Sequence, residues 1–117
     1  MTVLLPHERA HPRRKIYMAC EVAWEDHLVS GRVIDASYGG IGILFPQGAD
    51  LINGEVQVHI APLRESPVQS PEEIILRAQP TYRKAMTKGH HVGFRIKQIE
   101  NGEPDWKRLC DGLARSA

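Results

Sequence analysis

Three arginines lie close together near the N-terminus, in the segment 9–14 (RAHPRR). Each guanidinium group presents five donors in a planar fork, which matches phosphate oxygens and the O6 and N7 edge of guanine. Because Pro12 has no N–H and disfavours helix at the residue before it, we expect an extended or looped arm. On such an arm Arg9 and Arg13 can converge on one anionic ligand. The alternative, on these residues alone, is a solvated basic arm that pairs with Glu8.

A second group of polar and small residues occupies the hexapeptide 35–40 (DASYGG). The Asp35 carboxylate can accept hydrogen bonds from backbone amides or from the N1–H and amino group of a purine, and the Ser37 hydroxyl can donate and accept. Gly39 and Gly40 permit positive φ and let a ligand approach the backbone. The alternative is an ordinary strand connection in which Asp and Ser act as turn residues.

The elements between these two groups determine whether they meet. Residues 15–24 alternate apolar and polar side chains, which predicts a strand, and residues 28–35 predict a second strand after the polar turn 25–27. An antiparallel hairpin returns the chain to its starting end, so Arg13 and Asp35 are expected at the same end of the sheet. A cationic fork and an acceptor for a guanine edge would then flank one surface, which suits an anionic guanine nucleotide.

Further strands are predicted by alternation in segments 41–45, 55–60, 73–82 and 90–99, and the proline-containing stretch 61–71 is expected to be a mobile loop. The period then changes to that of an amphipathic helix, with Pro104 and Asp105 in its first turn. The apolar face of this helix contains Trp106, Leu109, Cys110 and Leu113.

We therefore predict an all-β fold with one helix: a six-stranded antiparallel β-barrel, a C-terminal helix packed on it and a flexible N-terminal arm. The arm comprises residues 1–14, and residues 15–117 form a single domain. Cys20 and Cys110 are expected to be buried, and Trp24 and Trp106 are both expected to pack between helix and barrel.

Composition excludes several classes of protein. The chain has 117 residues, 42% of them hydrophobic, and a net charge of +1, which argues against disorder and against a protein that coats nucleic acid. No apolar run reaches the roughly 18 residues of a membrane span, and no secretory signal is visible, so we expect a cytoplasmic protein. Residues 1–20 nevertheless contain four Lys or Arg and one acidic residue, which favours a small anionic ligand.

Catalysis and metal binding find no support in the sequence. It contains no paired catalytic carboxylates and no spacing typical of a Cys–His nucleophile, so we expect no enzyme activity and no catalytic residue. The pair His90-His91 is adjacent in a predicted strand, where neighbouring side chains point to opposite faces. These histidines are therefore not expected to bind a metal, and no cofactor is predicted.

The pattern Arg9-x-x-x-Arg13 followed by Asp35-x-Ser37-x-x-Gly40 resembles the signature of the PilZ domain. The resemblance extends from about residue 8 to residue 99, and it includes the segment 92–96 (VGFRI), which is similar to the last barrel strand of that family. It implies a six-stranded barrel with a C-terminal helix. It also implies a bacterial receptor for the second messenger cyclic di-GMP that is not an enzyme.

Carried over residue by residue, the resemblance assigns seven ligand-binding residues: Arg9, Arg13, Arg14, Asp35, Ser37, Gly39 and Gly40. The first two arginines would contact phosphates and stack on or hydrogen-bond guanine, and the third adds a phosphate or stacking contact. The carboxylate and hydroxyl would bind a guanine edge and nearby phosphate oxygens, while the glycines let the backbone close on the ligand. Binding would order the arm and change the surface that is offered to a protein partner or a covalently linked domain.

Several alternatives remain open from the sequence. Family members bind one nucleotide or an intercalated pair; Glu8 disfavours a second ligand by repulsion, whereas Arg14 adds cationic capacity and favours two. A PilZ-like adaptor that binds a protein and no nucleotide is a second interpretation, and the regulatory domain of a bacterial cellulose synthase, tethered to a membrane protein, is a third. An RNA-binding barrel is disfavoured because only 6% of residues are aromatic. Neither DNA nor RNA binding nor membrane contact within this chain is expected.

Overall fold

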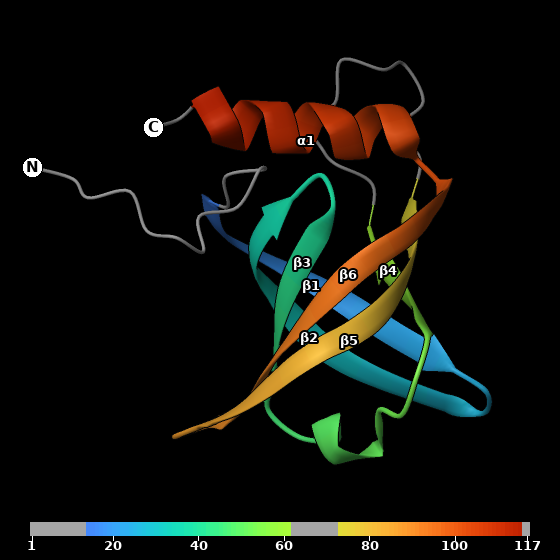
Figure 1. Ribbon diagram of the computed structural model, residues 1–117, viewed down its shortest axis with the longest axis vertical. Helices are drawn as coiled ribbons and strands as arrows, with labels where there is room; N and C mark the ends of the chain where they lie inside the picture. The colour runs from blue at the N-terminus through green and yellow to red at the C-terminus, as the bar shows by residue number, and fades with distance from the viewer. Residues whose placement is uncertain (1–13, 62–72, 116–117) are drawn as a thin grey trace, which may run out of the picture.

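The computed structural model describes residues 14–61 and 73–115, which form a closed barrel of six antiparallel strands with one helix across its end (Figure 1). The strands follow one another around the barrel in the order β1-β2-β3-β6-β5-β4. Their bounds are β1 Arg14–Trp24, β2 His27–Ser37, β3 Gly40–Phe45, β4 Val56–Ile60, β5 Ile74–Met86 and β6 Gly89–Asn101; a 3-10 turn, η1, spans Ala49–Leu51 and the helix, α1, spans Glu103–Arg115. The predicted fold class is confirmed.

The barrel interior is filled by every second residue of the strands, as alternation predicts. Strand β3 illustrates the pattern, since Ile41, Ile43 and Phe45 are fully buried. The ring of Phe45 meets that of Phe94 edge to face, with ring centroids 6.3 Å apart. The other fully buried strand side chains are Val22, Val33, Val58, Ile60, Ile74, Leu76, Ala78 and Val92.

The end of β2 differs from the prediction. Residues 35–37 continue the strand, and the turn consists of Tyr38 and Gly39 alone. An irregularity in the β2–β3 pairing between Val33 and Asp35 adds one residue to β2, as in a β-bulge. Because the bulge shifts the alternation by one residue, Val33 and Ala36 both point inward, and Asp35 faces outward.

The hairpin of β5 and β6 is longer than predicted. The sequence predicts strands at 73–82 and 90–99, whereas β5 continues to Met86 and β6 begins at Gly89. The residues from 81 to 88 are all exposed, so no alternation indicated this extension. The hairpin tip projects beyond the barrel (Figure 1). Most of the predicted loop 61–71 lies outside the described residues.

Helix α1 is held by its buried face and its first turn. Trp106 is fully buried and its indole Nε1 donates to the backbone oxygen of Tyr38 at 3.2 Å. The helix begins after Gly102, whose φ of 75° favours glycine and whose carbonyl accepts from the Trp106 N–H at 2.9 Å. Asp105, buried in the first turn, complements the helix dipole as predicted. The helix is thereby attached directly to the β2–β3 turn.

The prediction that Trp24 packs between the helix and the barrel is wrong. Trp24 ends β1 at the β1–β2 turn, and its ring lies 5.1 Å from that of His27. This turn is at the opposite end of the barrel from α1 (Figure 1). The alternation places Trp24 correctly on the half-buried face of β1, but strand length separates it from the helix.

Both cysteines are buried free thiols, as predicted. Burial raises the pKa of Cys20 and of Cys110 to about 12, because the thiolate is poorly solvated at either position. Among the described residues, no helix is long and apolar enough to cross a membrane.

Trp106→Phe tests the attachment of α1 to the β2–β3 turn. This change keeps an aromatic ring but removes the indole N–H that serves the Tyr38 carbonyl, and it leaves a small cavity. We expect the free energy of unfolding, measured by urea denaturation, to fall by about 1–3 kcal/mol. Lys107→Ala, at the exposed neighbouring position, is the control and should change it by less than about 0.5 kcal/mol. Wild-type stability in Trp106→Phe would contradict the attachment.

Candidate functional site

The residues predicted to bind a ligand fall at one end of the barrel, around the β2–β3 turn. Asp35 and Ser37 lie on β2, Gly39 is in the turn and Gly40 begins β3. Arg14 is the first residue of β1 and its backbone pairs with Ala36, so the chain before β1 enters directly beside Asp35 and Ser37. Arg9 and Arg13 lie outside the described residues.

A transverse row of four residues crosses the outer face of the barrel at Asp35. Asp35 pairs with Gly42 on β3, Gly42 pairs with Gly93 on β6, and Gly93 pairs with Tyr82 on β5. Two glycines therefore separate a carboxylate from an aromatic ring. They lower the surface at this point, because neither projects a side chain from the barrel.

The neighbouring side chains fold over the two glycines. A Cβ at Gly42 would lie 2.6 Å from Oδ2 of Asp35 and 2.8 Å from Nε2 of His91, and a Cβ at Gly93 would overlap the ring of Tyr82. The glycines are thus needed where they stand, since any larger residue would displace these groups. We call the three residues Gly40, Gly42 and Gly93 the glycine floor.

Three polar side chains make contact above the glycine floor. Nε2 of His91 lies 3.7 Å from Oδ2 of Asp35 and 3.3 Å from the hydroxyl of Tyr82. The Tyr82 ring meets the His91 ring edge-on, with centroids 5.4 Å apart. The side chain of Asp35 is 20% exposed and that of His91 is 16% exposed, so both remain accessible from solvent while their positions are constrained.

The β2–β3 turn is fixed from several sides. The Ser37 hydroxyl is mostly buried and donates to the Gly40 carbonyl at 3.5 Å, the outer limit of a hydrogen bond. The Ile96 N–H donates to the Gly39 carbonyl at 3.0 Å. These bonds hold the backbone of the turn against β6, so a ligand would meet a preformed surface there.

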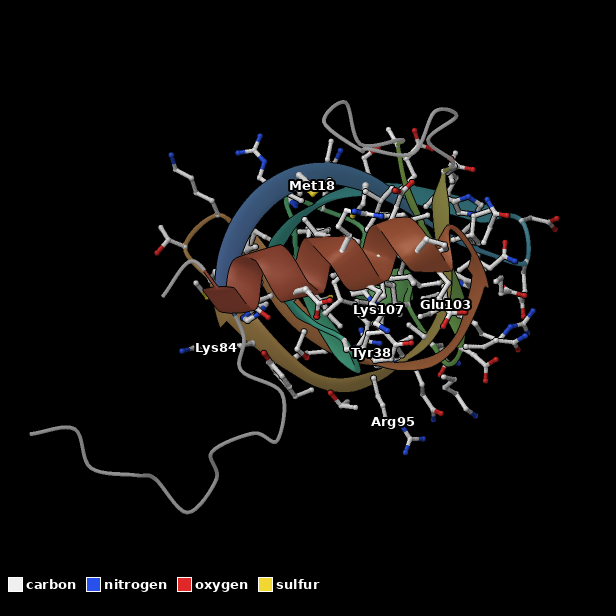
Figure 2. The ribbon with its side chains drawn as sticks, turned by 90° about the horizontal axis from the view of Figure 1, so that it is seen from above. Met18, Tyr38, Lys84, Arg95, Glu103 and Lys107 are labelled. Atoms are coloured by element: carbon white, nitrogen blue, oxygen red, sulfur yellow. The ribbon has the colours of Figure 1, made fainter. Side chains whose placement is uncertain are left out.

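Tyr38 connects the turn to the helix. Its hydroxyl donates at 3.1 Å to Oε1 of Glu103, the first residue of α1, and Figure 2 shows Tyr38 below the helix in the view along the barrel end. This hydrogen bond raises the pKa of Tyr38, since ionisation would lose the bond and place a phenolate beside a carboxylate. Tyr38 therefore joins the β2–β3 turn to the first residue of α1.

Sequence reasoning missed His91, Tyr82 and Gly42. The alternation of residues 41–45 contained one signal, because Gly42 falls on the outer face between two buried isoleucines. Tyr82 carried no such signal, since its place opposite Gly93 depends on an irregularity in the β5–β6 pairing after Pro80. Pairing between strands far apart in the sequence creates this part of the site.

The two adjacent histidines point to opposite faces of β6, as strand geometry requires. His91 faces Asp35, whereas His90 is exposed near the hairpin tip. Among the residues that the structure describes, no group of three His, Cys, Asp or Glu side chains could hold a metal ion.

Comparisons with known proteins agree on the fold. The family model described as PilZ domain matches residues 7–111. The chain is similar to the inhibitor of motility MotI of Bacillus subtilis (TM-score 0.72, 17% identity, 94% of this chain and 51% of MotI). It is also similar to the PilZ domain of YcgR from Escherichia coli, solved with cyclic di-GMP (TM-score 0.69, 18% identity, 94% of each chain).

A third similar structure is the PilZ domain of CeSA from a cellulose-synthesizing bacterium (TM-score 0.60, 26% identity, 88% of this chain and 98% of that one). This chain therefore spans about half the length of MotI but nearly all of the two isolated PilZ domains. No curated protein sequence matches it.

A double-mutant cycle tests the packing on the glycine floor. Gly93→Ala should lower the free energy of unfolding by about 1–3 kcal/mol, because the new methyl group displaces the Tyr82 ring. In a Tyr82→Ala background the same change should cost less than about 0.5 kcal/mol, since the ring is gone. Gly42→Ala is the matched control, and Tyr82→Ala should reduce its cost less, because the Asp35 carboxylate still occupies the position of the new methyl group. Equal costs of Gly93→Ala in both backgrounds, measured by urea denaturation, would refute this packing.

Proposed function

The chain belongs to the PilZ domain family, and we propose that it is a receptor for cyclic di-GMP that binds this ligand on the outer face of β2, β3 and β6. In this proposal the chain acts as a regulatory binding domain and not as an enzyme. The cyclic di-GMP in the structure of the YcgR PilZ domain supports this choice of ligand.

The juxtaposition at the start of β1 carries the proposal. The backbone of Arg14 pairs with Ala36, between Asp35 and Ser37, so the arginine-bearing segment joins the barrel at the residues that would bind guanine. Cations from that segment and a carboxylate from β2 can therefore act on one ligand. A cyclic dinucleotide carries two phosphates and two guanines, which need both kinds of group.

Each residue of the proposed site has a chemical role. Arg9 and Arg13 bind phosphate oxygens and stack on or hydrogen-bond guanine, with Arg14 as a further contact. The Asp35 carboxylate accepts from the N1–H and amino group of one guanine. Ser37 is mostly buried by its turn, so we assign it to positioning Gly40 as well as to a contact with a phosphate oxygen.

The glycine floor gives this site its shape. A planar base can lie close to the backbone at Gly40, because no Cβ holds it away, while the side chains of Asp35 and His91 cover Gly42. Tyr82, 40% exposed at the far side of Gly93, limits the floor and offers a ring edge or face to the ligand. The floor thus favours flat aromatic ligands over compact anions such as free phosphate.

Regulation would follow from ordering of the segment before β1. Fixing about fourteen residues costs conformational entropy, which charge-assisted hydrogen bonds to the ligand have to offset. The ordered segment then presents a new surface to a protein partner or a linked domain. The similarity to the PilZ domain of CeSA is compatible with a linked domain, and the cytoplasm, where this second messenger is made, is the proposed location.

Isothermal titration with cyclic di-GMP tests the proposed function. The wild-type protein should bind with a Kd in the micromolar range or tighter, and the same titration gives one or two ligands per chain. Arg13→Ala and Asp35→Ala should each weaken binding by about ten- to hundredfold, the effect of losing one or two charge-assisted hydrogen bonds.

Two controls accompany this titration. Glu21→Ala, an exposed position on β1 away from the β2–β3 turn, should leave the Kd unchanged, and urea denaturation should show that every variant remains folded. Absence of saturable binding by the folded wild-type protein at about 100 µM ligand would contradict the proposal. That result would favour the adaptor that binds a protein and no nucleotide.

A further inference from the structure

The β5–β6 hairpin is strongly basic, and half of its cations are already engaged. Residues 74–99 contain six Lys or Arg and no Asp or Glu. Arg77 pairs with Glu100 at 3.0 Å and Glu55 at 3.4 Å, and Lys97 pairs with Glu55 at 3.3 Å. Arg83 donates to the carbonyls of Ala49 and Ile52, which fixes the 3-10 turn η1.

The remaining three cations of the hairpin have no ion pair or hydrogen bond to any residue that the structure describes. Lys88 lies in the hairpin turn. Lys84 lies closer to the hairpin tip than Tyr82, at the position of β5 whose backbone is opposite His91. Arg95 lies midway along β6, beside the β2–β3 turn. It is therefore the unpartnered arginine of this hairpin nearest to Asp35 and Ser37.

Strand pairing fixes the position of Arg95. Its backbone pairs with Gly40, the last residue of the Asp-x-Ser-x-x-Gly pattern. The next residue, Ile96, donates its N–H to the Gly39 carbonyl at 3.0 Å, so Arg95 is held against the turn from the β6 side. Figure 2 shows its side chain projecting away from the barrel on the side of Tyr38.

Arg95 shares the outer face with Asp35. Val92 and Phe94 of β6 are fully buried, so the alternate residues His91, Gly93 and Arg95 face outward. Arg95 and Asp35 lie two strands apart across the barrel surface and two residues apart along it. The spacing of strands and residues then gives roughly 12 Å between their backbones. Gly40 lies between Arg95 and Ser37 in one row and carries no side chain, whereas Asp35, His91 and Tyr82 cover Gly42 and Gly93.

We propose that Arg95 is a further ligand-binding residue, which binds a phosphate of cyclic di-GMP from the β6 side of the site. This inference rests on the proposed function. The proposed function assigns arginines of the segment before β1 to the same ligand, so with Arg95 a dianionic ligand would be held by cations from two sides of the glycine floor. The guanidinium fork suits a phosphate, and Glu100, the carboxylate of its hairpin, is already paired with Arg77.

The same titration with cyclic di-GMP, applied to variants at Arg95, tests this inference. Arg95→Gln should raise the Kd by at least about tenfold, and Arg95→Lys should recover part of that loss because it keeps the charge but not the fork. Lys88→Gln is the matched control: it removes the same charge from the same hairpin, roughly 23 Å along β6. It should change the Kd by less than about twofold.

A second measurement distinguishes contact from a structural effect. In the wild-type protein, the Nε–H resonance of Arg95 should shift on saturation with cyclic di-GMP, whereas that of Arg83 should not. A Kd for Arg95→Gln within about twofold of wild type, with an unmoved resonance, would overturn the role of Arg95 even if Asp35→Ala abolishes binding. Equal losses in Arg95→Gln and Lys88→Gln would also overturn it, since they would indicate only long-range attraction. No binding by the wild-type protein would overturn the proposed function, and this inference with it.

Discussion

Strand β3 has to serve the core and the outer surface at once, and the candidate site depends on this constraint. Its odd-numbered residues Ile41, Ile43 and Phe45 fill the barrel, while Gly40 and Gly42 carry no side chain on the outside, where Asp35 and His91 cover Gly42. A large side chain at Gly42 would collide with Asp35 and His91, and a polar one at Ile41 or Ile43 would be buried without a partner. Neighbouring residues of β3 are therefore constrained for two different reasons.

The β2–β3 turn extends this constraint to the rest of the molecule. Its carbonyl groups accept from Trp106 of α1 and from Ile96 of β6, so the helix and the last strand both fix its backbone. Asp35 and Ser37, on the strand that leads into the turn, are positioned by the same contacts. Packing of the helix, far along the sequence, thus supports the geometry of the site without contributing a side chain to it.

The sequence predicted those parts of the fold that depend on local periodicity. Alternation identified all six strands, and the change of period identified α1, because core burial imposes those periods on single segments. It misplaced the end of β2, since a bulge near Ile34 reverses the alternation and no residue type signals it. The companions of Asp35, namely His91 and Tyr82, come from β6 and β5, and only pairing between distant strands brings them to this face.

The net charge of the whole chain and the local charge beside the site give different information about a ligand. A net charge of +1 says little about ligands, because most cations of β5 and β6 are neutralised by carboxylates or used to fix a turn. What matters for a small anion is the number of cations left without a partner beside a surface that it can approach. On the described part of the chain the outer face beside Gly40 meets this condition at Arg95, and there a flat dianionic ligand would gain charge-assisted bonds from a guanidinium that pairs with no described carboxylate. Engaged arginines such as Arg77 would first have to give up Glu55 and Glu100, which makes them poor ligand-binding groups despite their equal charge.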